Sequence, residues 1–199
     1  DLRVLQQSAN RFVVAADGLV LKEAGPRPKR SRLAFGVRPP VAWLLSRRSL
    51  ALLACGIPTH EPVAWSVKRV GGLRVRDYLV TREIVGTESL IPRLDRERAN
   101  RERREETLTQ LGRLTAALHR HRFGNRDMRG ANILCSREGP LRLWVTDLEG
   151  LRRIPWLPRR IAEGDLGPIA LSLRSHGWLT DPSDEAAFFA AYNAEAPPR

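Results

Sequence analysis

Three polar side chains in the second half of the chain have the types and the spacing that phosphate chemistry requires. Asn132 follows Asp127 by five positions, and Asp147 stands at the end of the next apolar run. The runs "ANILC" and "LRLWVTD" flank the turn-forming segment "SREGP", which predicts a hairpin of two short strands. Such a hairpin would return Asp147 to the neighbourhood of Asn132. Phosphoryl transfer needs a carboxylate beside the acceptor hydroxyl and oxygen ligands for Mg²⁺, and this trio offers both.

Each of these residues also has an ordinary structural interpretation when it is taken alone. Asp and Asn are common in turns and helix caps, because their side chains bond to nearby backbone groups. The three together, placed after a long helical pattern, favour a phosphate-transfer site over three unrelated turn residues. His119 and His121 are interpreted as packing residues at the end of that helix and not as catalytic groups.

The first half of the chain predicts a small antiparallel sheet with one helix. Its apolar runs are short, rich in Val and Leu, and separated by turn-forming segments. The expected elements are three strands between 3 and 23, a helix over 41–55, and two strands over 62–70 and 76–85. Lys22, at the end of the third strand, is placed to reach the phosphates of a nucleotide.

The second half predicts mainly helix. Its composition shifts at 86–90, which we interpret as a linker, and leucines at 108, 111, 114 and 118 then recur at helical spacing. This pattern predicts a long amphipathic helix over 96–121. Two further helices are expected over 165–177 and 182–195. The fold class is therefore α+β, with an N-terminal β-rich lobe (1–85) and a C-terminal, mainly helical lobe (86–199).

The charge balance indicates an anionic partner. The chain has 34 Lys and Arg against 22 Asp and Glu, a net charge of +12. The five Trp are scattered and do not alternate with Arg, so no nucleic acid is expected as a partner. The basic segment "PRPKRSR" (26–32) is a candidate for contact with anionic lipid headgroups. Two distant cysteines favour a reducing compartment, and no apolar segment is long enough to cross a bilayer.

Several segments together carry a resemblance to a known family. "NRDMRGANIL" followed by "WVTDLEG" resembles the catalytic loop and metal-binding segment of the protein-kinase-like superfamily. With "GLVLKE", "YLVTREIVG" and "EGDLGPIALSL", the chain resembles the bacterial lipopolysaccharide kinases, which phosphorylate Kdo or heptose sugars of the inner core. The resemblance implies a two-lobed protein-kinase-like fold that uses ATP and Mg²⁺. It also implies an anionic glycolipid or sugar acceptor, a cytoplasmic location and peripheral contact with the inner face of the inner membrane.

The resemblance also implies roles for individual residues in the helical lobe. Asp127 would be the catalytic base, and Arg129 would lie near the transferred phosphate. Asn132 and Asp147 would hold Mg²⁺. Asp165 resembles a buried carboxylate that braces the catalytic loop from a later helix.

In the β-rich lobe, the resemblance implies nucleotide contacts. Lys22 would contact the α- and β-phosphates, and residues 83–85 would form the hinge beside adenine, from Glu83 to Val85. The chain departs from the superfamily pattern in four ways. Asn125 stands where a His is usual, and Leu148-Glu149 follows Asp147 in place of Phe-Gly. No glycine-rich loop follows the first strand, and no acidic residue between 35 and 56 is available to pair with Lys22.

These departures keep alternative functions open. One is a catalytically silent nucleotide-binding pseudokinase or scaffold, and another is a kinase that acts on a protein or a small molecule. The intact Asp127, Asn132 and Asp147 argue against the silent form, because a scaffold needs none of them. A basic nucleic-acid binder would lose affinity steeply with salt and would have no need for Asp127.

Overall fold

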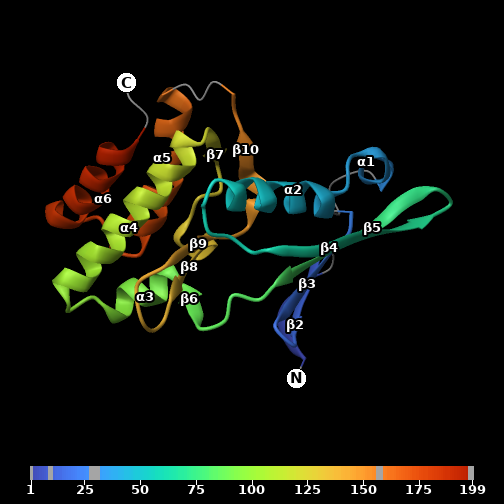
Figure 1. Cartoon of the computed structure of the whole chain (residues 1–199), viewed down its shortest axis with the longest axis horizontal. Coiled ribbons are helices and arrows are strands. Elements are labelled where there is room, and N and C mark those ends of the chain that lie inside the picture. The colour runs from blue at the N-terminus through green and yellow to red at the C-terminus, as the bar shows by residue number, and fades with distance from the viewer. Residues whose placement is uncertain (1, 9–10, 27–31, 156–158, 197–199) are drawn as a thin grey trace. The chain divides into compact units, whose positions relative to one another are not determined.

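A computed structural model describes residues 2–8, 11–26, 32–155 and 159–196, and Figure 1 traces their helices and strands. The chain forms two compact units, one made of 1–54 with 60–85 and the other of 55–59 with 86–199. The segment 55–59 thus packs with the second unit, although it lies inside the range expected for the N-terminal lobe. Residues 9–10 and most of the basic segment 26–32 lie outside the described residues.

The first unit is built on a five-stranded antiparallel sheet in the order β1-β2-β3-β5-β4. Its strands are β1 (Arg3–Ser8), β2 (Arg11–Ala16), β3 (Leu19–Ala24), β4 (Pro62–Val70) and β5 (Leu73–Arg82). Alternating side chains of β2 and β3 bury a small core of Val13, Ala15 and Val20. The three predicted strands between 3 and 23 are confirmed, as is the strand pair that follows the predicted helix.

Two helices pack against strands β4 and β5 of this sheet: α1 (Arg32–Val37) contacts β5, and α2 (Val41–Ala54) contacts both strands. A buried ion pair between Arg74 and Asp77 of β5 anchors their junction. The Asp77 carboxylate accepts a hydrogen bond from the backbone N of Val41 at 2.7 Å, and Arg74 donates to the carbonyl of Arg38 at 2.9 Å. These bonds satisfy a backbone N–H at the start of α2 and a carbonyl just after the end of α1, groups that helix ends otherwise leave without partners. The helix predicted over 41–55 is confirmed.

The second unit combines short strands with four helices. Its strands are β6 (Thr87–Ser89), β7 (Phe123–Asn125), β8 (Ile133–Ser136), β9 (Leu143–Val145) and β10 (Leu151–Arg153). Its helices are α3 (Leu90–Arg96), α4 (Arg101–Arg120), α5 (Arg159–Ser175) and α6 (Pro182–Glu195). The sheets have the orders β6-β8-β9 and β10-β7, so the hairpin predicted from "ANILC" and "LRLWVTD" is confirmed.

Two predictions for this unit need correction. The expected linker at 86–90 contains strand β6, which pairs with β8. The helix expected over 96–121 begins later, at Arg101 (α4), and the preceding helix α3, which ends at Arg96, was not predicted. Asn100 caps α4, since its side chain accepts a hydrogen bond from the backbone N of Arg103 at 3.1 Å. Charged residues on both sides of Asn100 made this cap difficult to recognise in the sequence.

Helix α4 is the structural axis of the second unit and packs along α6. Its predicted apolar leucines are buried, with Leu108 and Leu111 fully so. Gly112 permits the close approach of the two helices, because a Cβ there would lie 2.4 Å from the carbonyl oxygen of Phe188. None of the described helices has the length and apolar character that crossing a membrane requires.

Candidate active site

The loop that carries Asp127 is fixed at both ends by strand pairs of the second unit. We call residues 126–132 the Asp127 loop. Before it, β7 pairs with β10, with Asn125 opposite Leu151. After it, β8 pairs with β9, with Ile133 opposite Val145. The short turn from β9 to β10 begins at Asp147, so the pairing holds this turn next to the loop.

Hydrogen bonds bring Asn132 to Asp127 on one side and to the residue before Asp147 on the other. The Asn132 carbonyl accepts from the backbone N and the hydroxyl of Thr146, at 2.8 and 3.0 Å. The Asn132 side-chain Nδ2 donates to the backbone carbonyl of Asp127 at 2.8 Å. Because that carbonyl can only accept, the amide presents its Oδ1 on the opposite side, where it can serve as a metal ligand.

Asp147 adopts a left-handed backbone conformation, with φ of 51° and ψ of 66°. Non-glycine residues rarely adopt this region, and such residues cluster at functional sites. The conformation breaks β9 and turns the chain into the short 3₁₀ turn Leu148–Gly150. The strand end therefore presents a carboxylate at the position where the chain reverses, next to the residue that binds Asn132.

The Asp127 side chain is half-exposed and stands on a fixed backbone. Its backbone N donates to Oδ1 of Asn125 at 3.1 Å. The Arg129 guanidinium lies 3.5 Å from the Asp127 carboxylate, and the two side chains are 63% and 47% exposed. An ion pair this exposed contributes little to stability, about 0–1 kcal/mol. Both groups thus remain accessible to a phosphorylated ligand.

A buried network of side chains from the helices supports the strand residue that precedes the Asp127 loop. Asp165 of α5 is buried, and its Oδ2 accepts a hydrogen bond from the backbone N of Asn125 at 2.6 Å. This is the bracing contact that the family resemblance implied. His119 of α4 lies with its Nε2 3.8 Å from the same carboxylate oxygen, and its Nδ1 is 2.8 Å from the Tyr192 hydroxyl. His119 is therefore a buried packing residue, as predicted.

Tyr192 and Gly150 are parts of this arrangement that sequence reasoning missed. Tyr192 lies on α6 and meets the His119 ring edge-on, with ring centroids 5.6 Å apart. A Cβ on Gly150 would lie 3.0 Å from the Cβ of Asp127 and 3.0 Å from its backbone N. The only available signal was the glycine that closes "DLEG", which is not informative without the fold.

A third missed residue is Arg152 of β10. Its Nε and Nη2 atoms are buried and have no hydrogen-bond partner within the described part of the chain. In the β10–β7 pair it stands opposite Gly124, which has no side chain to cover it. A buried cation in this condition requires an explanation, and an anionic ligand is one. The sequence "LRR" gave no reason to separate it from the many surface arginines.

The residues that were predicted to contact the nucleotide lie in the first unit. Lys22 lies on β3 between Val13 and Leu79 of the neighbouring strands. Burial, together with the positive charge of Lys22, lowers the pKa of His60 to about 4. His60 is therefore neutral at physiological pH, and the positive charge in this part of the first unit comes from Lys22 and not from His60.

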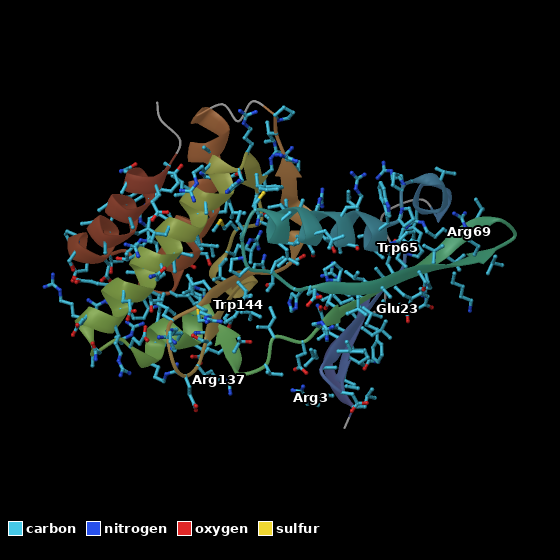
Figure 2. The ribbon with its side chains drawn as sticks, in the orientation of Figure 1. Arg3, Glu23, Trp65, Arg69, Arg137 and Trp144 are labelled. Atoms are coloured by element: carbon cyan, nitrogen blue, oxygen red, sulfur yellow. The ribbon has the colours of Figure 1, made fainter. Side chains whose placement is uncertain are left out.

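The predicted hinge residues follow the end of β5. The Glu83 backbone N donates to the carbonyl of Gly18 at 2.8 Å, and its carboxylate pairs with Arg3, which Figure 2 labels. Val85 is 72% exposed. Because the N–H of Glu83 is already engaged, a base bound here would have to use other backbone groups of residues 83–85.

The donor set of the second unit suits Mg²⁺. No group of three or more His, Cys, Asp or Glu side chains among the described residues is arranged to hold a metal ion. Asn132 and Asp147 instead offer one amide oxygen and one carboxylate. Mg²⁺ is commonly held by one or two carboxylates together with substrate phosphates and water, so these residues fit the ion when a nucleotide is bound.

Comparisons with known proteins converge on one family. The family model described as "Lipopolysaccharide kinase (Kdo/WaaP) family" matches residues 47–192. Among solved structures, "WaaP in complex with acyl carrier protein" matches with a TM-score of 0.71 and 22% sequence identity, over 98% of this chain and 79% of that chain. At this identity the structural match shows a shared fold, and it confirms the predicted α+β class. No curated protein matches the sequence.

Proposed function

The chain belongs to the lipopolysaccharide kinase (Kdo/WaaP) family, and from this membership we propose that it transfers the γ-phosphoryl group of ATP to a sugar hydroxyl of the lipopolysaccharide inner core, on Kdo or heptose. The observation that carries the proposal is the hydrogen-bonded link through Asn132. One residue binds the carbonyl of Asp127 with its side chain and the residue before Asp147 with its backbone. These bonds link Asp127, Asn132 and the turn at Asp147, as a base and two oxygen ligands of one site would require.

Asp127 would orient the acceptor hydroxyl and accept its proton as the oxygen attacks the γ-phosphorus. The new O–P bond forms as the bond from the γ-phosphorus to the bridging oxygen breaks, and ADP leaves. Asn132 and Asp147 would hold Mg²⁺, which when bound neutralises charge on the phosphate oxygens. Arg129, beside the Asp127 carboxylate, would place a cation near the transferred group.

The first unit would supply the remaining nucleotide contacts. Lys22 would bind the α- and β-phosphates, and the backbone of residues 83–85 would bind adenine, with Glu83 and Val85 at the ends of the hinge. Arg152 would bind an anionic group of the acceptor, because its buried Nε and Nη2 atoms have no hydrogen-bond partner within the described chain. The acceptor class of the family, an acidic sugar or glycolipid, is consistent with that role. The proposal also includes a location in the cytoplasm.

The test is transfer of labelled phosphate from ATP to a Kdo-containing or heptose-containing core acceptor. We expect Asp127→Asn to abolish transfer and to leave the thermal stabilisation by Mg²⁺ and ATP intact. Glu138→Gln is a matched control, because Glu138 is an exposed carboxylate in the β8–β9 turn of the same unit. Transfer at an unchanged rate by Asp127→Asn would contradict the assignment of the base.

Two alternative functions give different results in the same assay. A silent pseudokinase would bind ATP and transfer nothing to any acceptor in the wild-type form. A kinase of a protein or a small molecule would show turnover that depends on Asp127, but not with core sugars. The hydrogen bonds that join Asn132 to Asp127 and to Thr146, the residue before Asp147, favour a transferring enzyme.

A further inference from the structure

The tip of the β4–β5 hairpin exposes an aliphatic pair. Val70 and Leu73 stand opposite each other at the last rung of the hairpin and are 61% and 41% exposed. Gly71 and Gly72 between them have φ of 57° and 79°. Two consecutive positive φ angles are the mark of a tight two-residue turn, which holds the flanking side chains in a fixed arrangement. Figure 1 shows this hairpin extending beyond α1.

Cations directly flank the aliphatic pair. Lys68 and Arg69 are both exposed, and Arg69 donates to the carbonyl of Gly72 at 3.0 Å, which keeps its guanidinium at the turn. Figure 2 labels Arg69 at this end of the hairpin. The sequence has no Asp or Glu between Pro62 and Arg76. The hairpin tip, residues 68–73, is therefore apolar and positively charged, with no acidic side chain of its own.

The charge of the whole chain is concentrated in the same unit. The first unit contains 15 Lys and Arg against six Asp and Glu, a net charge of +9, whereas the second contains 19 against 16, a net charge of +3. A positive surface with exposed aliphatic side chains is complementary to an anionic lipid surface, where cations meet phosphates and apolar groups enter the headgroup boundary.

Protection of a sheet edge explains only part of this pattern. β4 is an edge strand, and lysines and irregular pairing commonly prevent such strands from pairing with other chains. Lys68, Arg69 and the register shift between them serve that purpose. They give no reason to expose Val70, or the part of Leu73 that α1 leaves uncovered: the Leu73 side chain lies beside Gly36 of α1 and is still 41% exposed. The aliphatic pair therefore needs an explanation of its own.

We propose that the hairpin tip, residues 68–73, docks on an anionic phospholipid bilayer. Val70 and Leu73 enter the boundary between headgroups and acyl chains, and Lys68 and Arg69 contact lipid phosphates. The proposal rests on the hairpin alone and does not depend on the proposed phosphoryl transfer. It assigns membrane contact to the β4–β5 hairpin, whereas the sequence analysis pointed to the basic segment 26–32.

The test is co-sedimentation of the full chain with vesicles of neutral phosphatidylcholine, and with vesicles that contain phosphatidylglycerol. Wild type is expected to bind the anionic vesicles and to be released by salt. Lys68→Gln with Arg69→Gln should weaken this binding more than tenfold, since each cation near an anionic surface contributes about fivefold. Val70→Ser with Leu73→Ser should weaken it about tenfold through lost apolar contact.

Two control variants on the second unit distinguish this docking from non-specific binding to vesicles. Leu171→Ser removes an aliphatic side chain that is 71% exposed, and Arg137→Gln removes an exposed cation. Both should bind anionic vesicles as wild type does. The transfer assay and the thermal midpoint of each variant report separately on activity and folding.

Three results would overturn the proposal. One is the absence of wild-type binding to anionic vesicles, and another is undiminished binding by folded tip variants. The third is a dimer in solution that Val70→Ser with Leu73→Ser dissociates, which would make a second copy of the chain the occupant of the tip.

Discussion

A methyl group added at Gly150 should displace Asp127, the residue that we propose as the catalytic base. The Cβ of an alanine there would lie 3.0 Å from three atoms, namely Oδ1 of Asn125 and the Cβ and backbone N of Asp127. Ordinary contacts of a Cβ begin near 3.4 Å, so the Asp127 loop has to move by about 0.4 Å. A displacement of 1 Å can cost a factor of about 100 in rate, so we expect kcat to fall about tenfold.

The same overpacking should cost about 1–3 kcal/mol of stability, or roughly 2–12 °C in the thermal midpoint for a chain of this size. The assay compares kcat, KM for ATP and the thermal midpoint of Gly150→Ala with those of wild type. KM for ATP should change little, because the clash involves the base and not the expected nucleotide contacts. Gly164→Ala is the matched control, since a Cβ at Gly164 meets nothing within 4 Å. A Gly150→Ala variant with wild-type kcat and midpoint would refute the reasoning.

Three further predictions concern buried groups. Tyr192→Phe leaves the Nδ1 of buried His119 without its partner, so the free energy of unfolding should fall by about 1–3 kcal/mol in a denaturant titration, and an unchanged value would contradict the role of the hydroxyl. Because burial and Lys22 lower the pKa of His60 to about 4, the unfolded chain binds the extra proton first. Stability should therefore fall as the pH drops from about 6.5 towards 4, and His60→Gln should reduce that slope in thermal unfolding at stepped pH. Burial raises the pKa of the Cys135 thiol to about 12, so iodoacetamide should leave it unmodified in the folded protein and label it after unfolding, as mass spectrometry can show.

The sequence predicted the elements around the site well where periodicity and turn chemistry agreed. The leucine spacing of α4 and the hairpin from Ile133 to Val145 both follow from local patterns, and the structure confirms them. The predicted start of the long helix at 96 was wrong, because charged residues on both sides of Asn100 continue the helical pattern. Strand β6 was missed because three residues that pair only with β8 carry no periodic signal of their own.

The predicted site was accessible from the sequence only as a set of residue types. The hydrogen bonds that join Asp127 to Asn132, and Asn132 to the turn at Asp147, depend on tertiary pairing of β7 with β10 and of β8 with β9. The supporting residues Gly150 and Tyr192 were not predictable, because their importance arises from contacts far along the chain.

The measurement that tests the central claim most directly is the thermal midpoint with ATP and Mg²⁺, with ATP alone, and with neither, for wild type and Asp147→Ala. If Asn132 and Asp147 hold Mg²⁺ on a bound nucleotide, wild type should be stabilised most by ATP with Mg²⁺, and Asp147→Ala should lose that increment. At a ligand concentration of about 100 times Kd the stabilisation should reach about 2.7 kcal/mol. An equal shift in Asp147→Ala, or no shift by Mg²⁺ and ATP in wild type, would contradict a metal-dependent kinase site in this chain.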